Sequence, residues 1–374
     1  MEIYIARPGD SLGSAARRFG LPEGELAALN QLGDPRRLTA GLALLIPSPA
    51  SAPAEPRELG ACLSETAPDS LLRELLPELS FYCPLCLSLT EDGGLAPPRS
   101  PRRKYPADTA APLLGAANIA KGAFSASLAR GVLGPAEGRE RFLAAALAEI
   151  EAGGFRGLFL KFCYLYPFDR EKYSDFLAFL SRELHSRGLY LFTALAPREE
   201  ERCESLLCAA HDYEAHGRYA DRSVLLAYDW GYECGAPQAV SPVNRLRRVL
   251  DYAAGKIPPG KLLLGFSGYG YNWALPWRQG QRALPILHTA AANLAVSLGV
   301  EVRFDPAFRA SYFIYTDSAS RRHIVWFEDA RSVQAKLELV EEYGLAGLCR
   351  CDGSRLCRAE LALICARFSP ALLP

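Results

Sequence analysis

Cysteine and lysine side chains are the most reactive groups in this sequence. The chain has 374 residues with 11 cysteines, and seven of its 42 basic residues are lysines. Thiolates bind soft metals and pairs of thiols form disulfides, although an odd number of cysteines cannot all pair within one chain. Cys83, Cys86, Lys161, Cys163 and Cys351 lie in or beside apolar runs that are typical of buried strands. Two interpretations are open, a metal or redox site and the filling of a buried space.

Alternating strand and helix patterns from residue 79 onward would position these side chains. The patterns predict strands at 79–89, 112–118, 157–164, 189–196, 223–228, 261–267 and 345–350, and helices at 138–152, 169–187, 241–254 and 330–343. This alternation indicates the α/β class and a parallel TIM (β/α)8 barrel. Residues 270–325 are too many for one loop, so we expect a small α+β insertion at about 272–325, before the last strand. Because side chains alternate along a strand, positions 159, 161 and 163 share one face, and Lys161 is expected to point into the barrel.

The first 47 residues predict a separate small βααβ domain. Asp10 or Ser11 can cap a first helix that ends at Gly20, and Pro22 begins a second helix. Residues 48–59 are rich in proline and alanine and predict a linker, which leaves residues 60–374 for the barrel.

Composition excludes several classes of partner and location. Basic and acidic residues balance at 42 each, so the chain lacks the basic excess of a nucleic-acid binder. No apolar run is long enough for a membrane span, and the first residues do not form a signal peptide. We therefore expect synthesis in the cytoplasm. Cys83 and Cys86 form a lone pair within a strand-like run, so we expect no metal and no cofactor.

The N-terminal segment resembles the LysM domain, a small module that binds glycans containing N-acetylglucosamine. The matching residues are Tyr4, the turn from Pro8 to Leu12, Ala16, Phe19-Gly20, Leu29-Asn30, Leu32, Pro35, Leu38, Gly41 and Ile46-Pro47. The resemblance implies that glycan contacts come from Gly9, Asp10, Ser11, Leu12, Asn30, Gln31 and Leu32.

The barrel resembles glycoside hydrolase family 18, in the branch of spore-cortex N-acetylglucosaminidases and spore germination proteins. The matching segments are Ala194–Pro197, His211–Tyr213, Ala227–Tyr232, Leu264-Gly265, Gly268–Trp273 and Val325–Ser332. In that family the fourth strand carries the motif D-x-x-D-x-D-x-E, in which the final Glu is the general acid and the preceding Asp orients the substrate acetamido group.

This chain departs from the family motif at all four positions. The aligned residues are Arg156, Phe159, Lys161 and Cys163, and none of them is a carboxylate. A glycosidic oxygen needs a proton donor to leave, and an unperturbed cysteine has a pKa of roughly 8.5, far from that of a tuned carboxylic acid. We therefore expect no catalytic residue at these positions.

Six residues on the later strands match positions that could still line a glycan groove. They are Tyr228, Asp229, Trp230, Tyr232, Tyr271 and Trp273, and the resemblance implies that Tyr228 and Asp229 would contact the sugar. Asp229 is also the expected ion-pair partner of Lys161, because a buried ammonium group needs a counter-charge.

Two hypotheses about function follow. The first is a protein that binds peptidoglycan through its LysM domain and carries an inactive barrel, located at the spore cortex or coat together with other coat proteins. The second is a divergent N-acetylglucosaminidase that acts on cortex peptidoglycan with another acid, Asp229 or Glu233. Fold resemblance alone does not separate them, because function depends on the site.

Overall fold

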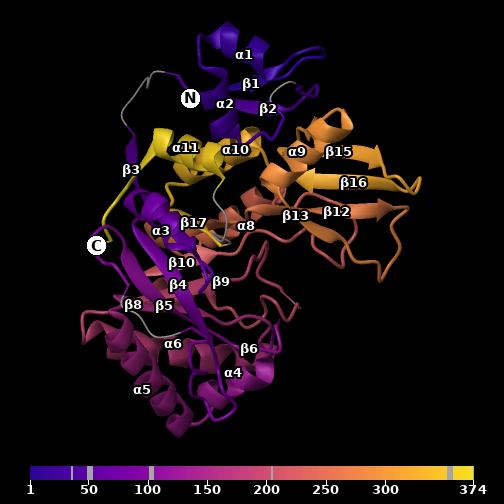
Figure 1. Cartoon of the computed structure of the whole chain (residues 1–374). Helices are drawn as coiled ribbons and strands as arrows, with labels where there is room; N and C mark the ends of the chain where they lie inside the picture. Colours follow the sequence, from indigo (N-terminus) through magenta and orange to yellow (C-terminus); the bar gives the residue numbers. More distant parts are fainter. Residues whose placement is uncertain (35–36, 49–53, 101–104, 204, 352–356, 374) are drawn as a thin grey trace.

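Eight parallel strands close into a barrel in the computed structural model, which describes residues 1–34, 37–48, 54–100, 105–203, 205–351 and 357–373 (Figure 1). Around the barrel the strands are β3 (Glu55–Cys62), β4 (Phe81–Ser88), β5 (Ala111–Ala117), β8 (Gly157–Lys161), β9 (Tyr190–Leu195), β10 (Arg222–Leu225), β11 (Leu262–Phe266) and β17 (Gly347–Arg350). The pairing of β17 with β3 closes the sheet, and β18 (Phe368–Pro370) adds to the outer edge of β3. The predicted TIM barrel is confirmed.

Helices cover the outside of the barrel. The four expected helices are α5 (Ala136–Gly153), α6 (Arg170–His185), α8 (Val243–Ala254) and α10 (Ala330–Glu342). Four more were not predicted: α3 (Asp69–Leu75), α4 (Ala126–Leu133), α7 (Tyr213–Tyr219) and α11 (Arg358–Arg367). Within the described part of the chain, no helix combines the length and apolar character needed to cross a bilayer.

The first barrel strand, β3, corrects the predicted linker. Residues 55–59 of the predicted linker at 48–59 belong to β3, while residues 49–53 lie outside the described part of the chain. The strand was missed because it begins with polar residues and carries Gly60 inside the barrel. A side chain at Gly60 would meet the ring of Phe81 at 2.0 Å, so the neighbouring strand fills that space instead.

The predicted insertion follows β11 and forms a five-stranded antiparallel sheet with one helix. Its elements are β12 (Tyr269–Leu275), β13 (Leu284–Leu287), α9 (His288–Leu298), β14 (Arg303–Asp305), β15 (Ala310–Thr316) and β16 (Arg322–Phe327). The sheet includes residues on both sides of the predicted range, because β12 pairs with β16 from Leu275↔Arg322 to Tyr271↔Trp326. The insertion therefore begins directly beside the end of β11.

The N-terminal domain has the expected βααβ order. It consists of β1 (Glu2–Ile5), α1 (Leu12–Phe19), α2 (Glu23–Asn30) and β2 (Ala43–Ile46). Ser11 caps α1 by accepting a hydrogen bond from the backbone N–H of Ser14, and Gly20 ends the helix with φ of 67°.

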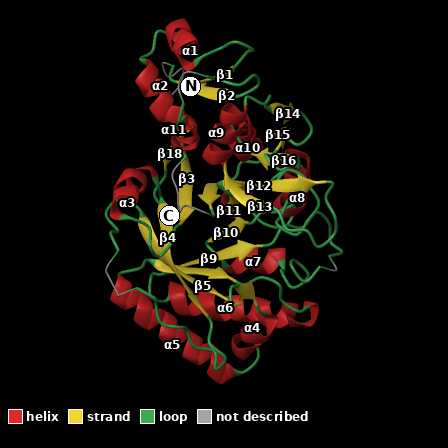
Figure 2. Cartoon of the chain, turned by 45° about the vertical axis from the view of Figure 1, so that its right-hand side comes forward, coloured by secondary structure: helices red, strands yellow, loops and turns green. Residues whose placement is uncertain are grey.

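This domain packs directly on the insertion and shares its apolar core (Figure 2). Buried residues of both parts form one cluster, among them Leu12, Leu44, Ala295, Phe313 and Phe327. Such a small domain buries little apolar surface on its own, so the insertion extends its core.

Hydrogen bonds to backbone carbonyls of the N-terminal domain reinforce this junction. The N–H of Val302 donates to the carbonyl of Ala40 at 2.9 Å, and the Arg331 guanidinium donates to the carbonyl of Gly41 at 3.0 Å. Gly41 has φ of 80°, and a Cβ there would lie 1.8 Å from the carbonyl oxygen of Val302. Glycine at this position allows the two parts to approach closely.

Candidate functional site

The carboxyl ends of the barrel strands form a mouth that gathers most of the reactive side chains. Strand alternation sets their direction: Leu158 and Leu160 face the surrounding helices, whereas Phe159 and Cys163 belong to the cluster inside the barrel. Lys161 shares the inward face, as predicted from the spacing along the strand.

Cys163 is held rigidly beneath the mouth. Asn118, which directly follows β5, accepts a hydrogen bond from the N–H of Cys163 at 3.0 Å and donates to its carbonyl at 2.9 Å. Burial raises the pKa of the Cys163 thiol to about 11, although Lys161 opposes the shift. A buried thiol with a raised pKa is a poor proton donor to a glycosidic oxygen.

Lys161 does not form the predicted ion pair with Asp229. Among the described residues, no carboxylate lies within 4.0 Å of its ammonium group. Asp229 instead accepts hydrogen bonds from the Tyr269 hydroxyl at 3.0 and 3.1 Å. Burial lowers the pKa of Lys161, but the negative charge of nearby cysteines in their ionised form, Cys62 first, raises it more strongly.

Asp229 has an uncommon backbone conformation and a raised side-chain pKa. Its φ of 63° lies in the left-handed region, which is uncommon for residues other than glycine and which recurs at functional sites. Asp229 is exposed at the mouth, yet desolvation raises its pKa, while the Tyr269 hydroxyl and then Lys161 act in the opposite direction. Glu233, the other acid considered, pairs with Arg282 at 2.7 Å.

The aromatic residues predicted to line a groove separate into two groups. Trp273 is 1% exposed and donates to the carbonyl of Gly235 at 2.8 Å, and Tyr271 packs beside it in a separate core. Trp230 packs against the cluster between barrel and helices. The expectation that Trp273 lines an open groove is therefore wrong, because its indole is enclosed by the insertion.

The other aromatic residues lie at the mouth. Tyr232 is 47% exposed, and Tyr228 contacts the inner cluster. Tyr164 and Tyr269 were not predicted. Tyr164 is 46% exposed, has φ of 54° and stacks on Phe124 with ring centroids 5.9 Å apart. Burial first, then the charges of Cys163, Asp229 and Tyr232, raise the pKa of Tyr164, so these groups are neighbours.

A sequence signal for Tyr164 was available. It immediately follows Cys163, at the end of the strand that aligns with the family motif. Tyr269 lies in the matching segment Gly268–Trp273, but its contact with Asp229 depends on how the insertion returns toward the mouth. The exposed rings of Tyr164 and Tyr232 can stack on the apolar faces of sugar rings.

The seven positions implied as glycan contacts in the N-terminal domain have mostly structural roles. Leu12 is buried in the core, and Asp10 accepts hydrogen bonds from the Tyr4 hydroxyl at 2.6 Å and the Arg7 N–H at 2.7 Å. Ser11 is the helix cap described above. Gly9 is exposed in the first loop with φ of 87°, and a Cβ added there would meet no atom within 4 Å.

The second loop of the domain faces the barrel. The side-chain amide of Asn30 bonds to the backbone of Leu26 and Leu45, at 2.8 to 3.0 Å. Gln31 accepts from the N–H of Arg358 at 2.9 Å, and Leu32 lines a cavity between this domain and the barrel. This loop therefore contributes to docking the domain.

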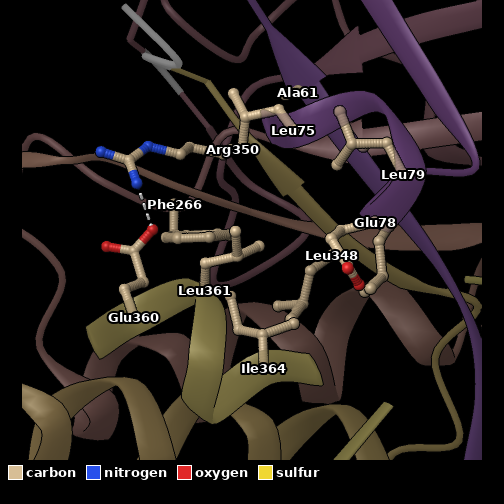
Figure 3. A pocket seen from close by; sticks show the side chains of 12 residues that line it. Ala61, Leu75, Glu78, Leu79, Phe266, Leu348, Arg350, Glu360, Leu361 and Ile364 are labelled. Carbon is tan, nitrogen blue, oxygen red and sulfur yellow. Dashed lines mark hydrogen bonds and ion pairs between the residues drawn. The ribbon is translucent and has the colours of Figure 1, made fainter. Parts of the chain in front are cut away.

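An apolar pocket lies outside the barrel wall, between β3, β17 and helices α3 and α11 (Figure 3). Its lining includes Leu75, Leu348 and Ile364, and Arg350 donates to Glu360 at 2.5 Å across one side. The pocket is separated from the mouth by the barrel wall, and its apolar lining does not suit a polar glycan.

Comparison with known proteins agrees with this architecture. The profile of glycosyl hydrolases family 18 matches residues 110–350, and the profile of the LysM domain matches residues 4–47. The chain therefore belongs to glycosyl hydrolases family 18 and carries an N-terminal LysM domain.

Its relatives include enzymes of the spore cortex. The Cortical fragment-lytic enzyme of Bacillus subtilis (strain 168) is 36% identical over 404 residues, which cover 93% of this chain and 94% of that protein. The spore cortex-lytic enzyme SleL of Bacillus megaterium QM B1551 matches with a TM-score of 0.89 at 27% identity over 98% of both chains. SleL of Bacillus cereus matches with a TM-score of 0.78 at 31% identity over 98% of this chain and 86% of that one.

Proposed function

We propose that this protein binds peptidoglycan of the spore cortex and that its barrel does not hydrolyse the glycan. The LysM domain is the binding module, and the barrel mouth is a second, non-hydrolytic contact for N-acetylglucosamine-containing chains. The protein associates with the cortex or coat, where other coat proteins are further partners.

The observation that carries this proposal is the chemistry at the end of β8. Lys161 and Cys163 align with the Asp and Glu of the family motif, and Lys161 has no carboxylate within 4.0 Å among the described residues. The hydrolytic step of this family develops positive charge on the substrate, which an ammonium group destabilises. General acid catalysis contributes about 10²–10⁴-fold, and a buried thiol does not supply it.

Hydrolysis assays test the inactive barrel. Purified full-length protein is incubated with cortex muropeptides and with a chromogenic chitobioside, and we expect no turnover above the uncatalysed rate. Lys161→Asp combined with Cys163→Glu is expected to introduce activity, whereas Lys161→Gln combined with Cys163→Gln, which adds no carboxylate, is the matched control. Turnover by the unaltered chain would refute the proposal.

Binding assays test the LysM contact without deleting the domain. Gly9→Asn keeps a residue that tolerates the left-handed region and adds bulk in the open first loop, so it is expected to weaken sedimentation with purified cortex peptidoglycan. Gly188→Asn is the matched control, because Gly188 has φ of 67° and equally open surroundings between α6 and β9. Equal binding by the two variants would contradict the predicted contact.

The barrel contact is tested by removing exposed rings. Tyr232→Ala and Tyr164→Ala are each expected to weaken the affinity for a soluble N-acetylglucosamine oligomer about two- to tenfold, as expected for the loss of an aromatic contact of about 0.5–1.5 kcal/mol. Unchanged affinity in both variants would remove the barrel mouth from the binding surface.

A second candidate function is a divergent N-acetylglucosaminidase, and one observation favours it. The left-handed backbone and raised pKa of Asp229 are features that a general acid would have. If the unaltered chain turns over substrate and Asp229→Asn abolishes turnover while leaving peptidoglycan binding intact, this second function is correct.

A further inference from the structure

Six of the nine free cysteines gather at one end of the barrel. They are Cys62 at the end of β3, Cys83 and Cys86 on β4, Cys163 after β8, and Cys349 and Cys351 at the end of β17. Cys62, Cys83, Cys163, Cys349 and Cys351 belong to the cluster inside the barrel or pack against it. Cys234, Cys357 and Cys365 are free outside this group, and Cys203 and Cys208 form a disulfide.

Strand register places Cys62 between two other cysteines. On one side its Cα partner on β4 is Cys83. On the other side, Gly60 and Ala61 pair with Cys349 and Arg350 at the end of β17, so continuation of this register places Cys351, the residue after β17, beside Cys62. Adjacent strands lie about 4.8 Å apart, within the Cα separation of about 4.4–6.8 Å found in disulfides.

Two of these thiols are both close to each other and accessible. The strand register brings Cys62 and Cys351 side by side, and both residues are partly exposed. Cys83 and Cys349 are buried. Solvent-borne reagents therefore reach Cys62, Cys351 and the exposed Cys86 before the buried Cys83, Cys163 and Cys349.

The mouth also favours the thiolate form of Cys62. The neighbouring thiols of Cys349 first, then Cys351 and Cys83, lower the pKa of Cys62 against the effect of burial, and the charge of Lys161 acts in the same direction. Among the described residues, no carboxylate pairs with the Lys161 ammonium group within 4.0 Å, and Asp229 interacts with its charge from farther away. Thiolates are the reactive form of cysteine.

We propose that the barrel mouth is a redox site in which Cys62 reacts with a hydroperoxide and then forms a reversible disulfide with Cys351. Metal binding is a weaker interpretation, because no group of three or more Cys, His, Asp or Glu side chains in the described part of the chain has the arrangement to hold a metal ion. The proposal does not depend on glycan binding or hydrolysis.

The reaction balances in two steps. The Cys62 thiolate attacks one oxygen of hydrogen peroxide, so an S–O bond forms, the O–O bond breaks, and the hydroxide that leaves takes a proton to become water. The Cys351 thiol then attacks the sulfur of the Cys62 sulfenic acid and gives up its proton to the departing oxygen. An S–S bond forms, the S–O bond breaks, and the oxygen leaves as a second water after taking up the proton from Cys351. Two thiols are oxidised to one disulfide while one peroxide is reduced to two waters.

Peptide mapping of the full-length protein tests the site. The reduced protein is treated with hydrogen peroxide, free thiols are alkylated, and peptides are identified by mass spectrometry. We expect a peroxide-dependent peptide that joins Cys62 to Cys351 and disappears after dithiothreitol. The Cys203–Cys208 disulfide yields a different peptide and is scored separately.

Variants assign the two roles. Cys351→Ser is expected to leave Cys62 as a sulfenic acid that dimedone labels. Cys62→Ser is expected to abolish both the label and the cross-link. Cys365→Ser, on α11, is the control and is expected to change neither. Lys161→Met is expected to slow the peroxide reaction about tenfold, the change that one unit of pKa gives in thiolate fraction. If Cys62 stays fully alkylatable in peroxide-treated unaltered protein, or if the cross-link survives in Cys62→Ser, the proposal is wrong.

Discussion

A buried histidine at the start of α9 should make folding sensitive to mild acid. His288 is 5% exposed, and its Nδ1 accepts a hydrogen bond from the N–H of Glu328 at 3.1 Å. Its Nε2 lies 3.2 Å from the carbonyl oxygen of Ser267, which can only accept, so Nε2 carries the proton of the neutral ring. Burial first, and then the charge of Arg350, lowers the pKa of His288 to about 3.

The size of the effect follows from proton linkage. The unfolded chain binds a proton at this histidine below its ordinary pKa of about 6.5, whereas the folded chain resists protonation until about 3. The stabilisation is therefore complete above about pH 6.5 and is lost as the pH falls toward 3, at about 1.4 kcal/mol per pH unit. At about pH 5 the loss from this residue amounts to about 2 kcal/mol.

Urea unfolding at about pH 7.5 and about pH 5 measures this loss. We expect His288→Asn, which keeps an acceptor near Nδ1, to lose about 2 kcal/mol less between the two pH values than the unaltered protein. The buried His211 and His216 are present in both proteins, so their contributions cancel. His185→Asn, at an exposed position on α6, is the control and should behave like the unaltered protein. An equal pH-dependent loss in His288→Asn would refute the reasoning.

Three further predictions concern the junctions of the fold. The ammonium group of Lys336 lies 2.5 Å from the buried carboxylate of Glu328, so Lys336→Met should lower the free energy of unfolding in urea by about 3–5 kcal/mol. Adding Glu328→Gln should restore most of this loss, and failure to do so would contradict the pairing. Gly41→Ala should lower the free energy of unfolding by at least about 1–2 kcal/mol and speed proteolysis of the N-terminal domain, because the methyl group would meet the carbonyl of Val302. Unchanged proteolysis would argue against close docking. Asn30→Ala should lower the thermal midpoint through a loss of about 1–3 kcal/mol, and an unchanged midpoint would show that its backbone hydrogen bonds contribute little.

The barrel was predictable wherever its strands are strongly apolar. Runs such as Leu189–Ala196 and Lys261–Ser267 are too short and too apolar for anything but buried strands between helices, and both contain strands of the barrel. Strand β3 was not predictable in the same way, because its inward position 60 is a glycine whose space is filled by Phe81 on the next strand. Tertiary packing, which local pattern does not report, determines that strand.

The same distinction applies to the candidate site. The direction of Lys161 and Cys163 follows from the two-residue period of a strand, so the sequence was sufficient. The role of Cys62 was missed because its strand was missed. The partner of Asp229 also could not be predicted, since the choice between Lys161 and Tyr269 depends on where the insertion brings the Tyr269 hydroxyl.

The shared core of the LysM domain and the insertion limits how the domain can be removed from this protein or transferred to another. Removal of the N-terminal domain would uncover Ala295, Phe313 and Phe327 together, which creates an apolar patch on the remaining chain. The LysM domain therefore cannot be transferred alone to another protein. The surface of the insertion on which it packs would have to be transferred with it. A glycan chain bound by the LysM domain would also have a fixed direction relative to the barrel. The LysM domain would then orient the glycan as well as anchor the protein to it.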